Sequence, residues 1–319
     1  MDKYINILIA CDKNYAPFYG VMLNSLFRHN PQSRFDIYLL TDDSFGSNIR
    51  HQYEVLVASH NSRLTIRMVD KNDLASCPLN INHHVNLAGY YHFLMPKLLP
   101  PSVDKIIYMD GDMIVRGDIR PIWDIDMDGY AMSAPLDGNT FEQSQYARLG
   151  MKRRSGYVNN GFALFNLKYW REHNISDKMF SYVNEHYNAL TLMDQDVENA
   201  VLEDVIKPMP IKYNFQILMF MDYFWRNFTP EFKEEVLASA SSPIIVHYTG
   251  SIKPWNFKYF GWPYLHMWEE EASYTPWKHT RTRKPITKYI KYLIKRLIHS
   301  RRLYASRNAY FIKEAYELA

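Results

Sequence analysis

Two carboxylates stand one residue apart in the segment Asp110-Gly111-Asp112, directly after the apolar run Lys105 to Met109. Alternate side chains of an extended segment point to the same side, so the two carboxylates can converge on one cation. The glycine between them leaves room for a pyrophosphate. Because α/β enzymes bind ligands where buried strands end, the pair favours a metal-bound sugar-nucleotide site. For this motif alone a structural alternative stays open, since acidic pairs also cap strands and form turns.

A second polar segment, His247 to Trp255, follows the apolar run Pro243 to Val246. His247 offers an imidazole ligand, Gly250 a close backbone approach, and Lys253 an ammonium group for a phosphate. A single histidine or lysine more often has only a structural or solvated role. The joint presence of these residues with the carboxylate pair favours a site for a metal and a diphosphate.

The elements that must position these residues alternate between β-rich runs and helical patterns. This alternation predicts an α/β fold with a Rossmann-like, mostly parallel central sheet. A long polar connection over residues 135–158 and an aromatic-rich, irregular segment over 206–228 lie further along the chain. The predicted strands are 4–10, 35–41, 63–69, 105–109, 130–134 and 161–166, and the predicted helices are 18–28, 47–60 and 169–187.

Composition excludes several classes of protein. With 319 residues, 47% of them hydrophobic, the chain can bury the core of one large domain and carry an appendage. No apolar stretch has the length of a membrane span, and the run 4–10 is too short for a signal peptide, so we expect a cytoplasmic protein. Cys11 and Cys77 are too few for a disulfide framework or a cysteine metal site.

Charge is distributed unevenly between the body and the C-terminal end. Residues 278–313 hold 12 Lys or Arg and no acidic residue, whereas the rest of the chain has 25 basic and 34 acidic side chains, a net charge of −9. We therefore divide the chain into a catalytic domain, 1–274, and a basic helical C-terminal region, 275–319. An acidic body argues against nucleic acid as a partner.

The C-terminal region has apolar residues at helical spacing between Ile286 and Ile298, and lysines on the opposite face. A basic amphipathic helix of this kind suits an anionic membrane surface, which predicts a peripheral protein at the inner face of the cell membrane. The alternative is a helix that docks on the acidic body.

Several motifs, in order over about residues 4–265, give the chain a resemblance to the retaining glycosyltransferases of family 8, which include bacterial lipopolysaccharide galactosyl- and glucosyltransferases and glycogenin. The resemblance implies the GT-A fold. It also implies that Asp110, Asp112 and His247 bind Mn²⁺, with Mg²⁺ as the alternative ion. The segment from Ala10 to Tyr15 is similar to the uridine-binding strand end of the family, which implies donor contacts from Ala10, Cys11, Asp12, Asn14 and Tyr15.

Two further motifs concern the donor sugar. The segment 158–166 is similar to the Phe-Asn-Ala/Ser-Gly signature and implies that Asn159 lies beside the sugar. The segment 193–196 matches the Asp-Gln-Asp element, which makes Asp194 an acceptor for sugar hydroxyls and Gln195 the side chain facing the anomeric carbon. Without the resemblance, Asp194 could equally be a helix cap. Gly250 and Lys253 would hold the diphosphate.

One position departs from the family pattern. Many members have Tyr-x-Arg before the Asp-x-Asp strand, whereas this chain has Tyr90-Tyr91-His92. A guanidinium is always charged and can hold two acceptors at once, whereas an imidazole can be neutral at pH 7. Either His92 contacts the donor in a weaker version of the arginine's role, or the alignment with the family pattern slips at this position.

These observations predict a retaining hexosyltransferase that moves glucose or galactose from a UDP-sugar to a glycan, glycolipid or glycoprotein. Gln195 is a poor nucleophile, so we favour attack by the acceptor on the face that UDP leaves, with Asp194 as the alternative nucleophile. The departure at His92 motivates a second hypothesis, a degenerate member that acts as the non-enzymatic partner of an active transferase. A metal-dependent nucleotidyltransferase or phosphoesterase would leave His247, Asp194 and Gln195 without a role.

Overall fold

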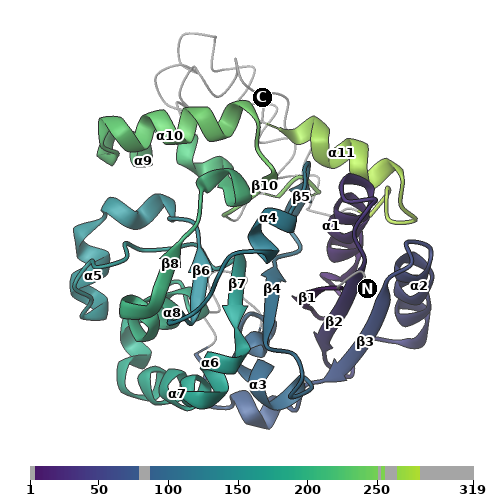
Figure 1. Ribbon diagram of the computed structural model, residues 1–319, viewed down its shortest axis with the longest axis horizontal. Helices are drawn as coiled ribbons and strands as arrows, with labels where there is room; N and C mark the ends of the chain where they lie inside the picture. The colour runs from purple at the N-terminus through teal and green to yellow at the C-terminus, as the bar shows by residue number, and fades with distance from the viewer. Residues whose placement is uncertain (1–3, 79–86, 251–252, 256–263, 281–319) are drawn as a thin grey trace, which may run out of the picture.

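The computed structural model of the protein describes residues 4–78, 87–250, 253–255 and 264–280. Within these residues the main sheet has the strand order β3-β2-β1-β4-β7-β6-β8 (Figure 1). β1, β2, β3 and β4 are parallel to one another, and β7 is antiparallel to both of its neighbours. The predicted α/β fold with a mostly parallel sheet is confirmed. The strands are β1 (Ile5–Ala10), β2 (Phe35–Thr41), β3 (Arg63–Met68), β4 (Lys105–Met109), β6 (Met132–Ala134), β7 (Phe162–Asn166) and β8 (Ile206–Pro208).

The sheet has its topological switch point at β1, which lies between β2 on one side and β4 on the other. Chain connections leave in opposite directions from such a point, and the crevice between the strand ends is where open α/β sheets bind ligands. The chain emerges there at Asp12 after β1 and at Asp110 after β4. The fold itself therefore brings two of the predicted segments together.

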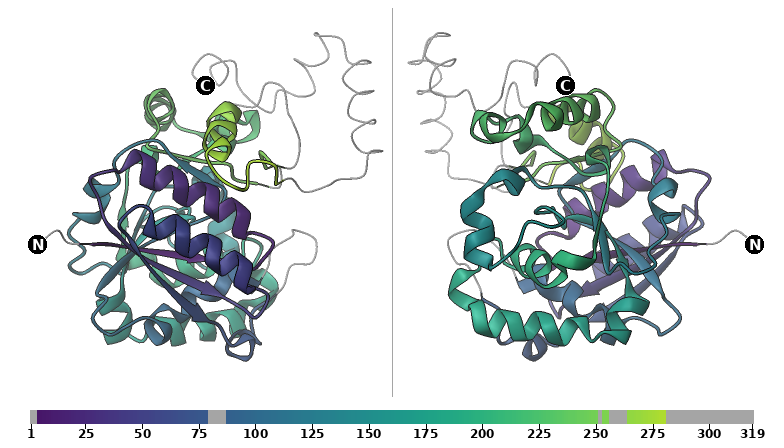
Figure 2. Two further views of the ribbon diagram at one scale, coloured as in Figure 1. Left: turned by 90° about the vertical axis from the view of Figure 1, so that its right-hand side faces the viewer. Right: turned by 60° about the vertical axis from the view of Figure 1, so that its left-hand side comes forward.

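Hydrophobic residues alternate between the two faces of the sheet. In β1, Ile5, Ile7 and Ile9 belong to the core that includes α1, whereas Leu8 and Ala10 belong to the core that includes α7 and α8. Figure 2 shows α1 and α2 together on one face. The helices are α1 (Ala16–His29), α2 (Ser47–Ala58), α3 (Met95–Leu98), α4 (Arg120–Trp123), α5 (Gln143–Leu149), α6 (Leu167–Glu172), α7 (Ile175–His186), α8 (Asp194–Leu202), α9 (Asp222–Asn227), α10 (Pro230–Ser241) and α11 (Leu265–Ser273).

A second, smaller sheet lies beside the switch point. It consists of β5 (Met113–Val115), β10 (Ile245–His247) and β9 (Phe215–Gln216), with β10 in the middle. β10 is antiparallel to β5, with His247 opposite Met113, and parallel to β9, with His247 opposite Gln216. This sheet therefore carries residues from far along the chain to the loop after β4.

Two segments contain more separate elements than the sequence pattern predicts. The predicted helix 169–187 is instead two helices, α6 and α7, because Asn174 between them adopts a left-handed conformation with φ of 50°. The connection 135–158 contains α5 and a 3₁₀ turn, and 206–228 is irregular as predicted apart from short elements. The 3₁₀ helices are η1 (Lys71–Leu74), η3 (Leu87–Leu94), η4 (Gly138–Phe141), η5 (Tyr187–Ala189), η6 (Glu203–Val205), η7 (Ile211–Asn214) and η8 (Ile217–Phe220).

The chain stays packed on the body beyond α11. Trp277 is buried, and its ring occupies the space that a side chain at Gly20 would fill. Glu271 in α11 is fully buried and pairs with Arg28 at 2.9 Å. The predicted amphipathic helix between 286 and 298 lies outside the described residues, so it and the division at 274/275 stay predictions.

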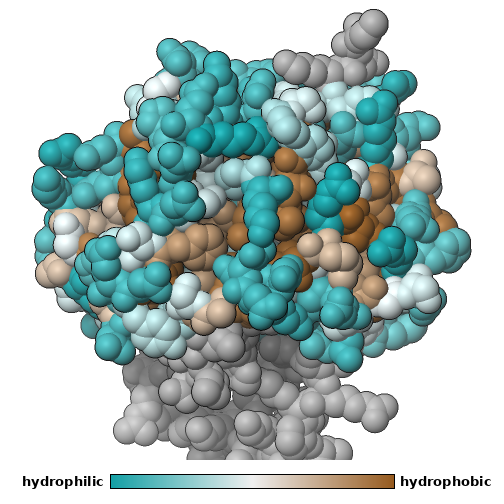
Figure 3. Space-filling view, turned by 90° about the horizontal axis from the view of Figure 1, so that it is seen from below, coloured by the Kyte–Doolittle hydropathy of each residue, from teal (hydrophilic) through white to brown (hydrophobic). Residues whose placement is uncertain are grey.

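Some apolar side chains reach the surface of the described residues. On the face shown in Figure 3, apolar residues appear between hydrophilic ones. Among the described residues, no helix is both long and apolar enough to cross a membrane. The large exposed apolar side chains come from separate elements: Val55, Met68, Tyr187, Leu192, Tyr223 and Tyr274.

Candidate active site

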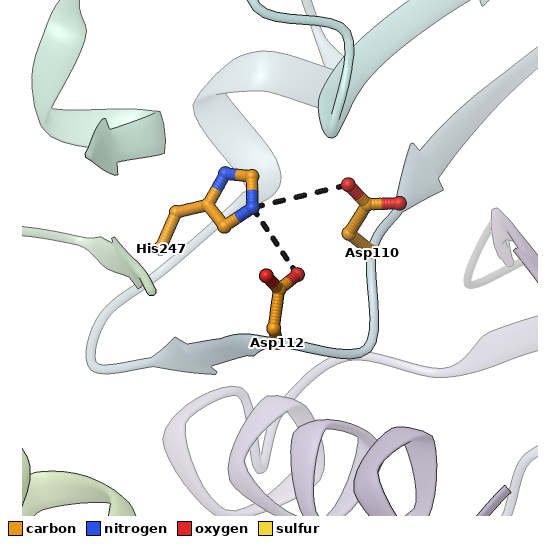
Figure 4. A group of neighbouring side chains, drawn as sticks. All are labelled: Asp110, Asp112 and His247. Carbon is orange, nitrogen blue, oxygen red and sulfur yellow. Dashed lines mark ion pairs between the residues drawn. The ribbon is translucent and has the colours of Figure 1, made fainter. Parts of the chain in front are cut away.

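Asp110, Asp112 and His247 converge at the switch point, with their ligand atoms all within 4.8 Å of one another. His247 Nε2 lies 3.1 Å from Asp112 Oδ1 and 3.8 Å from Asp110 Oδ2 (Figure 4). About one third of the Asp110 side chain is exposed, so the group is open to solvent on one side. Two carboxylates and one imidazole form an acidic oxygen and nitrogen set that fits a divalent cation.

Backbone pairing fixes the positions of both carboxylates. The N–H of Asp110 donates to the carbonyl of Gly161 at 2.8 Å, and the N–H of Tyr248 donates to the carbonyl of Asp112 at 2.9 Å. The two aspartates are therefore tied to the segment before β7 and to the segment after β10. The convergence predicted from i, i+2 spacing is present, and the small sheet adds the third ligand.

Lys253 supplies positive charge next to the group. Its Nζ contacts Asp112 Oδ2 and donates to the carbonyl of Tyr248 at 2.9 Å. Burial alone would raise the pKa of Asp112, but Lys253 and His247 hold it well below its usual range. Asp112 is therefore a carboxylate at neutral pH, and the lysine is positioned for a second anion beside it.

Asn214 determines which imidazole nitrogen faces the carboxylates. Its Oδ1 lies 2.8 Å from His247 Nδ1, and its amide nitrogen donates to Asn159 Oδ1 at 2.8 Å. Because the amide oxygen must be an acceptor, this assignment makes Nδ1 the protonated nitrogen of His247. With Nδ1 holding a proton, Nε2 is the nitrogen that can offer its lone pair to a cation bound beside the carboxylates, which is the tautomer that binds metal.

Two glycines are required for different reasons. A Cβ atom at Gly161 would lie 2.5 Å from His247 Cε1 and 2.6 Å from Asp110 Oδ2, so any side chain there would obstruct the group. A Cβ atom at Gly111 would lie 2.5 Å from the ring of Tyr19. Packing against this ring is thus a reason for glycine within Asp-x-Asp besides the predicted room for a pyrophosphate.

Hydrogen bonds connect the side chain of Gln195 with those of Asn159 and Asp137. Asn159 donates to Gln195 Oε1 at 3.1 Å and to Asp137 Oδ2 at 2.9 Å, and the Gln195 amide nitrogen donates to the same Asp137 oxygen at 3.3 Å. Asn159 Oδ1 also accepts from the N–H of Gly161 at 3.2 Å. Through Asn159, the side chain of Gln195 is connected to the segment that lies against Asp110 and His247.

Asp194 is the first residue of α8. Burial raises its pKa to about 7, and its Oδ2 accepts from Asn160 at 2.7 Å. Met193 before it adopts the strained conformation φ 51°, ψ −116°. Asp196 has a structural role, because it is fully buried and accepts from Arg148 at 2.8 Å and from Tyr157 at 2.6 Å.

The segment after β1 forms a tight turn. Asp12 Oδ1 accepts from the backbone N–H groups of Asn14 and Tyr15 at 2.9 and 3.0 Å, and Asn14 Nδ2 donates to Asp12 Oδ2 at 3.0 Å. Ala10 and Cys11 are buried. The ring of Tyr15 meets that of Trp255 edge to face at 6.3 Å, so the two predicted donor segments are neighbours.

His92 is fully buried in η3, and its Nε2 lies 2.8 Å from Oε1 of Glu198 in α8. The structure therefore gives it a carboxylate partner that the Tyr-x-Arg comparison did not suggest. Sequence reasoning also missed Asn214 and Asp137. Asp137 could have been noticed because it follows a predicted strand, as Asp12 and Asp110 do, whereas Asn214 carried no signal within the irregular segment.

Known proteins resemble this chain over most of its length. Residues 6–258 match the family model described as Glycosyl transferase family 8. Lipopolysaccharide glucosyltransferase WaaO of Escherichia coli K12 is 28% identical over 88% of this chain and 81% of that protein. Lipopolysaccharide 1,3-galactosyltransferase of Salmonella typhimurium LT2 is 27% identical over 97% of this chain and 90% of that protein.

Solved structures show the same fold. Galactosyltransferase LgtC, in complex with donor and acceptor sugar analogues, matches with a TM-score of 0.76 and 23% identity, covering 85% of this chain and 96% of that chain. The apo structure of the bifunctional glycosyltransferase WbbM matches with a TM-score of 0.72 and 22% identity, over 87% of this chain and 51% of that chain. These likenesses confirm the GT-A fold that was expected from the motifs.

Proposed function

The chain belongs to glycosyl transferase family 8, and we propose that it moves glucose or galactose from a UDP-sugar to a glycan, glycolipid or glycoprotein acceptor with retention of configuration. The observation that carries this proposal is the convergence of Asp110, Asp112 and His247 at the switch point of the sheet. Family membership makes the chain a glycosyltransferase that uses a nucleotide-sugar donor. The relatives named as glucosyl- and galactosyltransferases support a hexose as the transferred sugar.

The residues present fit a divalent cation, and we propose Mn²⁺. Asp110 and Asp112 would supply carboxylate oxygens and His247 the Nε2 lone pair, a mixed set that Mn²⁺ accepts more readily than the harder Mg²⁺ does. A bound divalent cation stabilises the negative charge that develops on a leaving diphosphate. Asn214 keeps His247 in the tautomer that this ligand set needs.

Lys253 and Gly250 would bind the diphosphate. Lys253 already contacts Asp112, so its ammonium group is next to the ligand set, and it adds charge where the leaving group becomes anionic. Gly250 has φ of 87°, a conformation that favours glycine, and this lets the backbone turn toward the ligand. Asp12, Asn14 and Tyr15, beside Trp255, would contact the uridine.

The sugar would lie between the ligand set and the first turn of α8. Asp194 would accept from its hydroxyls, and Asn159 holds the amide of Gln195 on the same side. An amide is a poor nucleophile but can stabilise a positively charged sugar centre through its oxygen. We therefore propose that the acceptor attacks from the face that UDP leaves, with a phosphate oxygen of UDP taking its proton. Mass-spectrometric trapping of a covalent sugar on Asp194 would contradict this.

Nothing in the comparisons favours the non-enzymatic hypothesis. Mn²⁺-dependent release of UDP distinguishes it from the proposed activity. We would assay a panel of UDP-sugars with the wild type and with Asp112→Asn. The matched control is Asp124→Asn, because Asp124 is an exposed aspartate directly after α4. We expect Asp112→Asn to lower UDP release by about 10²-fold or more, which corresponds to roughly 3 kcal/mol of transition-state stabilisation. Unchanged activity would remove the basis of the proposal.

The basic C-terminal region, 275–319, supports a further part of the proposal. We propose that it attaches the enzyme to an anionic membrane surface at the cytoplasmic side, close to a lipid-linked acceptor. Because Trp277 packs on the body, a deletion should begin after Thr280. Removal of 281–319 should abolish binding to vesicles containing anionic lipid and leave UDP-sugar hydrolysis unchanged. Retained vesicle binding would favour a tail that docks on the body.

A further inference from the structure

Two buried ionisable side chains lie beside the residues that are proposed to bind the donor. His92 in η3 and Glu198 in α8 are both fully buried, with His92 Nε2 2.8 Å from Glu198 Oε1. The imidazole N–H is not aimed along this line, and Nδ1 and Oε2 have no hydrogen-bond partner among the described residues. The contact is thus an ion pair that lacks the extra hydrogen bonds which usually support a buried charge.

A stability role does not explain this pair. Buried ion pairs gain little over well-packed apolar residues, because both charges must be removed from water. Aromatic rings pack on part of the imidazole: the His92 ring lies 5.0 Å from the ring of Phe93 and 6.1 Å from that of Phe165. Two hydrophobic side chains would fill such a space at no electrostatic cost. The charge must therefore be explained by what it acts on.

The pair lies between Asp194, at the start of α8, and Tyr108, which contacts Asp110 of the ligand set. Glu198 is one helical turn after Asp194, so both side chains are on one face of α8. On the other side, the His92 ring packs at 5.0 Å against Tyr108, whose hydroxyl donates to Asp110 Oδ1 at 2.8 Å. His92 is thereby next to the residue that holds a metal ligand and to the helix that begins with Asp194.

Charge complementarity favours an imidazolium at this place. Burial lowers the pKa of His92, but Glu198, Asp194 and Asp110 outweigh it and raise the pKa above its ordinary value. Burial raises the pKa of Asp194, and His92 is the largest influence that lowers it. Among the described residues, these three carboxyls are the groups that raise the pKa of His92, and the ring of Tyr108 packs against the imidazole.

We propose that His92 and Glu198 form a positioning pair for the donor sugar, in which Glu198 holds a charged imidazole that stabilises the carboxylate of Asp194. Where the family pattern has arginine, which is always charged, this chain has an imidazole whose positive charge depends on Glu198. This inference rests on the proposed function, because Asp194 is taken to bind sugar hydroxyls. Because both side chains are fully buried, the pair acts through Asp194, in place of the donor contact that the family resemblance implied for His92.

The test separates sugar binding from nucleotide binding. For Glu198→Gln and His92→Gln we expect an increase of about tenfold or more in the KM for the UDP-sugar, with the dissociation constant for UDP and Mn²⁺ unchanged. In His92→Gln, the pH at which the UDP-sugar affinity rises should move upward by about one unit, because Asp194 loses its countercharge while the Glu198 carboxylate, which raises its pKa, remains. The exposed Glu172→Gln in α6 is the matched control.

An arginine at position 92 should restore donor affinity to the Glu198→Gln variant. In a Glu198→Gln background, His92→Arg supplies a charge that needs no carboxylate to keep its proton, so the KM should return toward that of the wild type. Should the single variants fail to fold, ¹⁵N NMR of the wild-type histidines tests the same point, since one imidazole should lose its proton at a higher pH than an exposed histidine does. A folded Glu198→Gln with unchanged KM and pH profile, or no such imidazolium, would overturn the inference. If the wild type itself does not bind UDP, the proposed function is refuted instead.

Discussion

Asp194 is a carboxyl group that the fold keeps largely protonated below neutral pH, because burial raises its pKa to about 7. The unfolded chain releases this proton near 3.8, so the folded state binds more protons between about pH 4 and 7 and loses stability as the pH rises through that window. We expect Asp194→Asn to raise the free energy of unfolding by up to about 4 kcal/mol at pH 8 and to change it little at pH 4.

Denaturant unfolding at the two pH values measures this difference. The matched control is Asp177→Asn, an exposed aspartate in the first turn of α7. The same substitution at Asp194 should lower sugar transfer by about 10²-fold, because an amide offers one acceptor oxygen and no charge to the sugar. Equal stabilisation at both pH values would contradict the pKa assigned to Asp194.

Asn214 acts on the metal through His247. Asn214→Ala removes the acceptor for Nδ1–H, so the imidazole can rotate or adopt the other tautomer. We expect the affinity for Mn²⁺ to fall by about 10- to 100-fold, as measured by calorimetric titration. The exposed Asn227→Ala at the end of α9 is the control. An affinity that is the same in both variants would show that β10 alone orients the ring.

The turn that leads into β7 limits how closely the ligand elements can approach. Gly161→Ala would place a Cβ within 2.6 Å of both His247 and Asp110, so β10 or the loop after β4 must shift. We expect loss of most Mn²⁺ affinity and of UDP release, while the far-UV circular dichroism stays unchanged. Gly46→Ala at the start of α2 is the matched control, because its Cβ would meet nothing within 4 Å. Activity equal to the control would contradict the close packing.

The elements show which parts of this site the sequence could predict. Strands such as β1 and β4 are largely apolar and are followed by polar residues, so their positions and the acidic residues after them follow from the pattern. The break between α6 and α7 does not, because Asn174 interrupts a helical pattern without proline or glycine. β5, β9 and β10 have only two or three residues each, too few for a periodic signal.

The residues missed by sequence reasoning share one property, which is that their partners are distant in the chain. Asn214 meets His247 across 33 residues, and Glu198 meets His92 across 106. Pairings of this kind depend on how sheets and helices pack, and a single sequence does not record them. The motif residues were found because their chemistry is local: Asp110 with Asp112, and Asp194 with Gln195.

The molecule as a whole should become more stable when the ligand set is filled. Asp110 and Asp112 belong to the loop between β4 of the main sheet and β5 of the small sheet, whereas His247 ends β10, so a bound cation joins segments that are 135 residues apart. A ligand that binds only the folded state at 100 times its dissociation constant raises the free energy of unfolding by about 2.7 kcal/mol.

For a chain of 319 residues that increment corresponds to a rise in Tm of roughly 4 °C. Differential scanning calorimetry with and without Mn²⁺ measures it, and UDP added with the metal should raise the Tm further, since Lys253 lies beside the ligand set. Asp112→Asn should lose the metal-dependent increment, because one ligand is gone and Asp110 alone cannot hold the ion beside His247. A variant whose Tm rises with Mn²⁺ as much as that of the wild type would place the stabilising metal elsewhere on the protein.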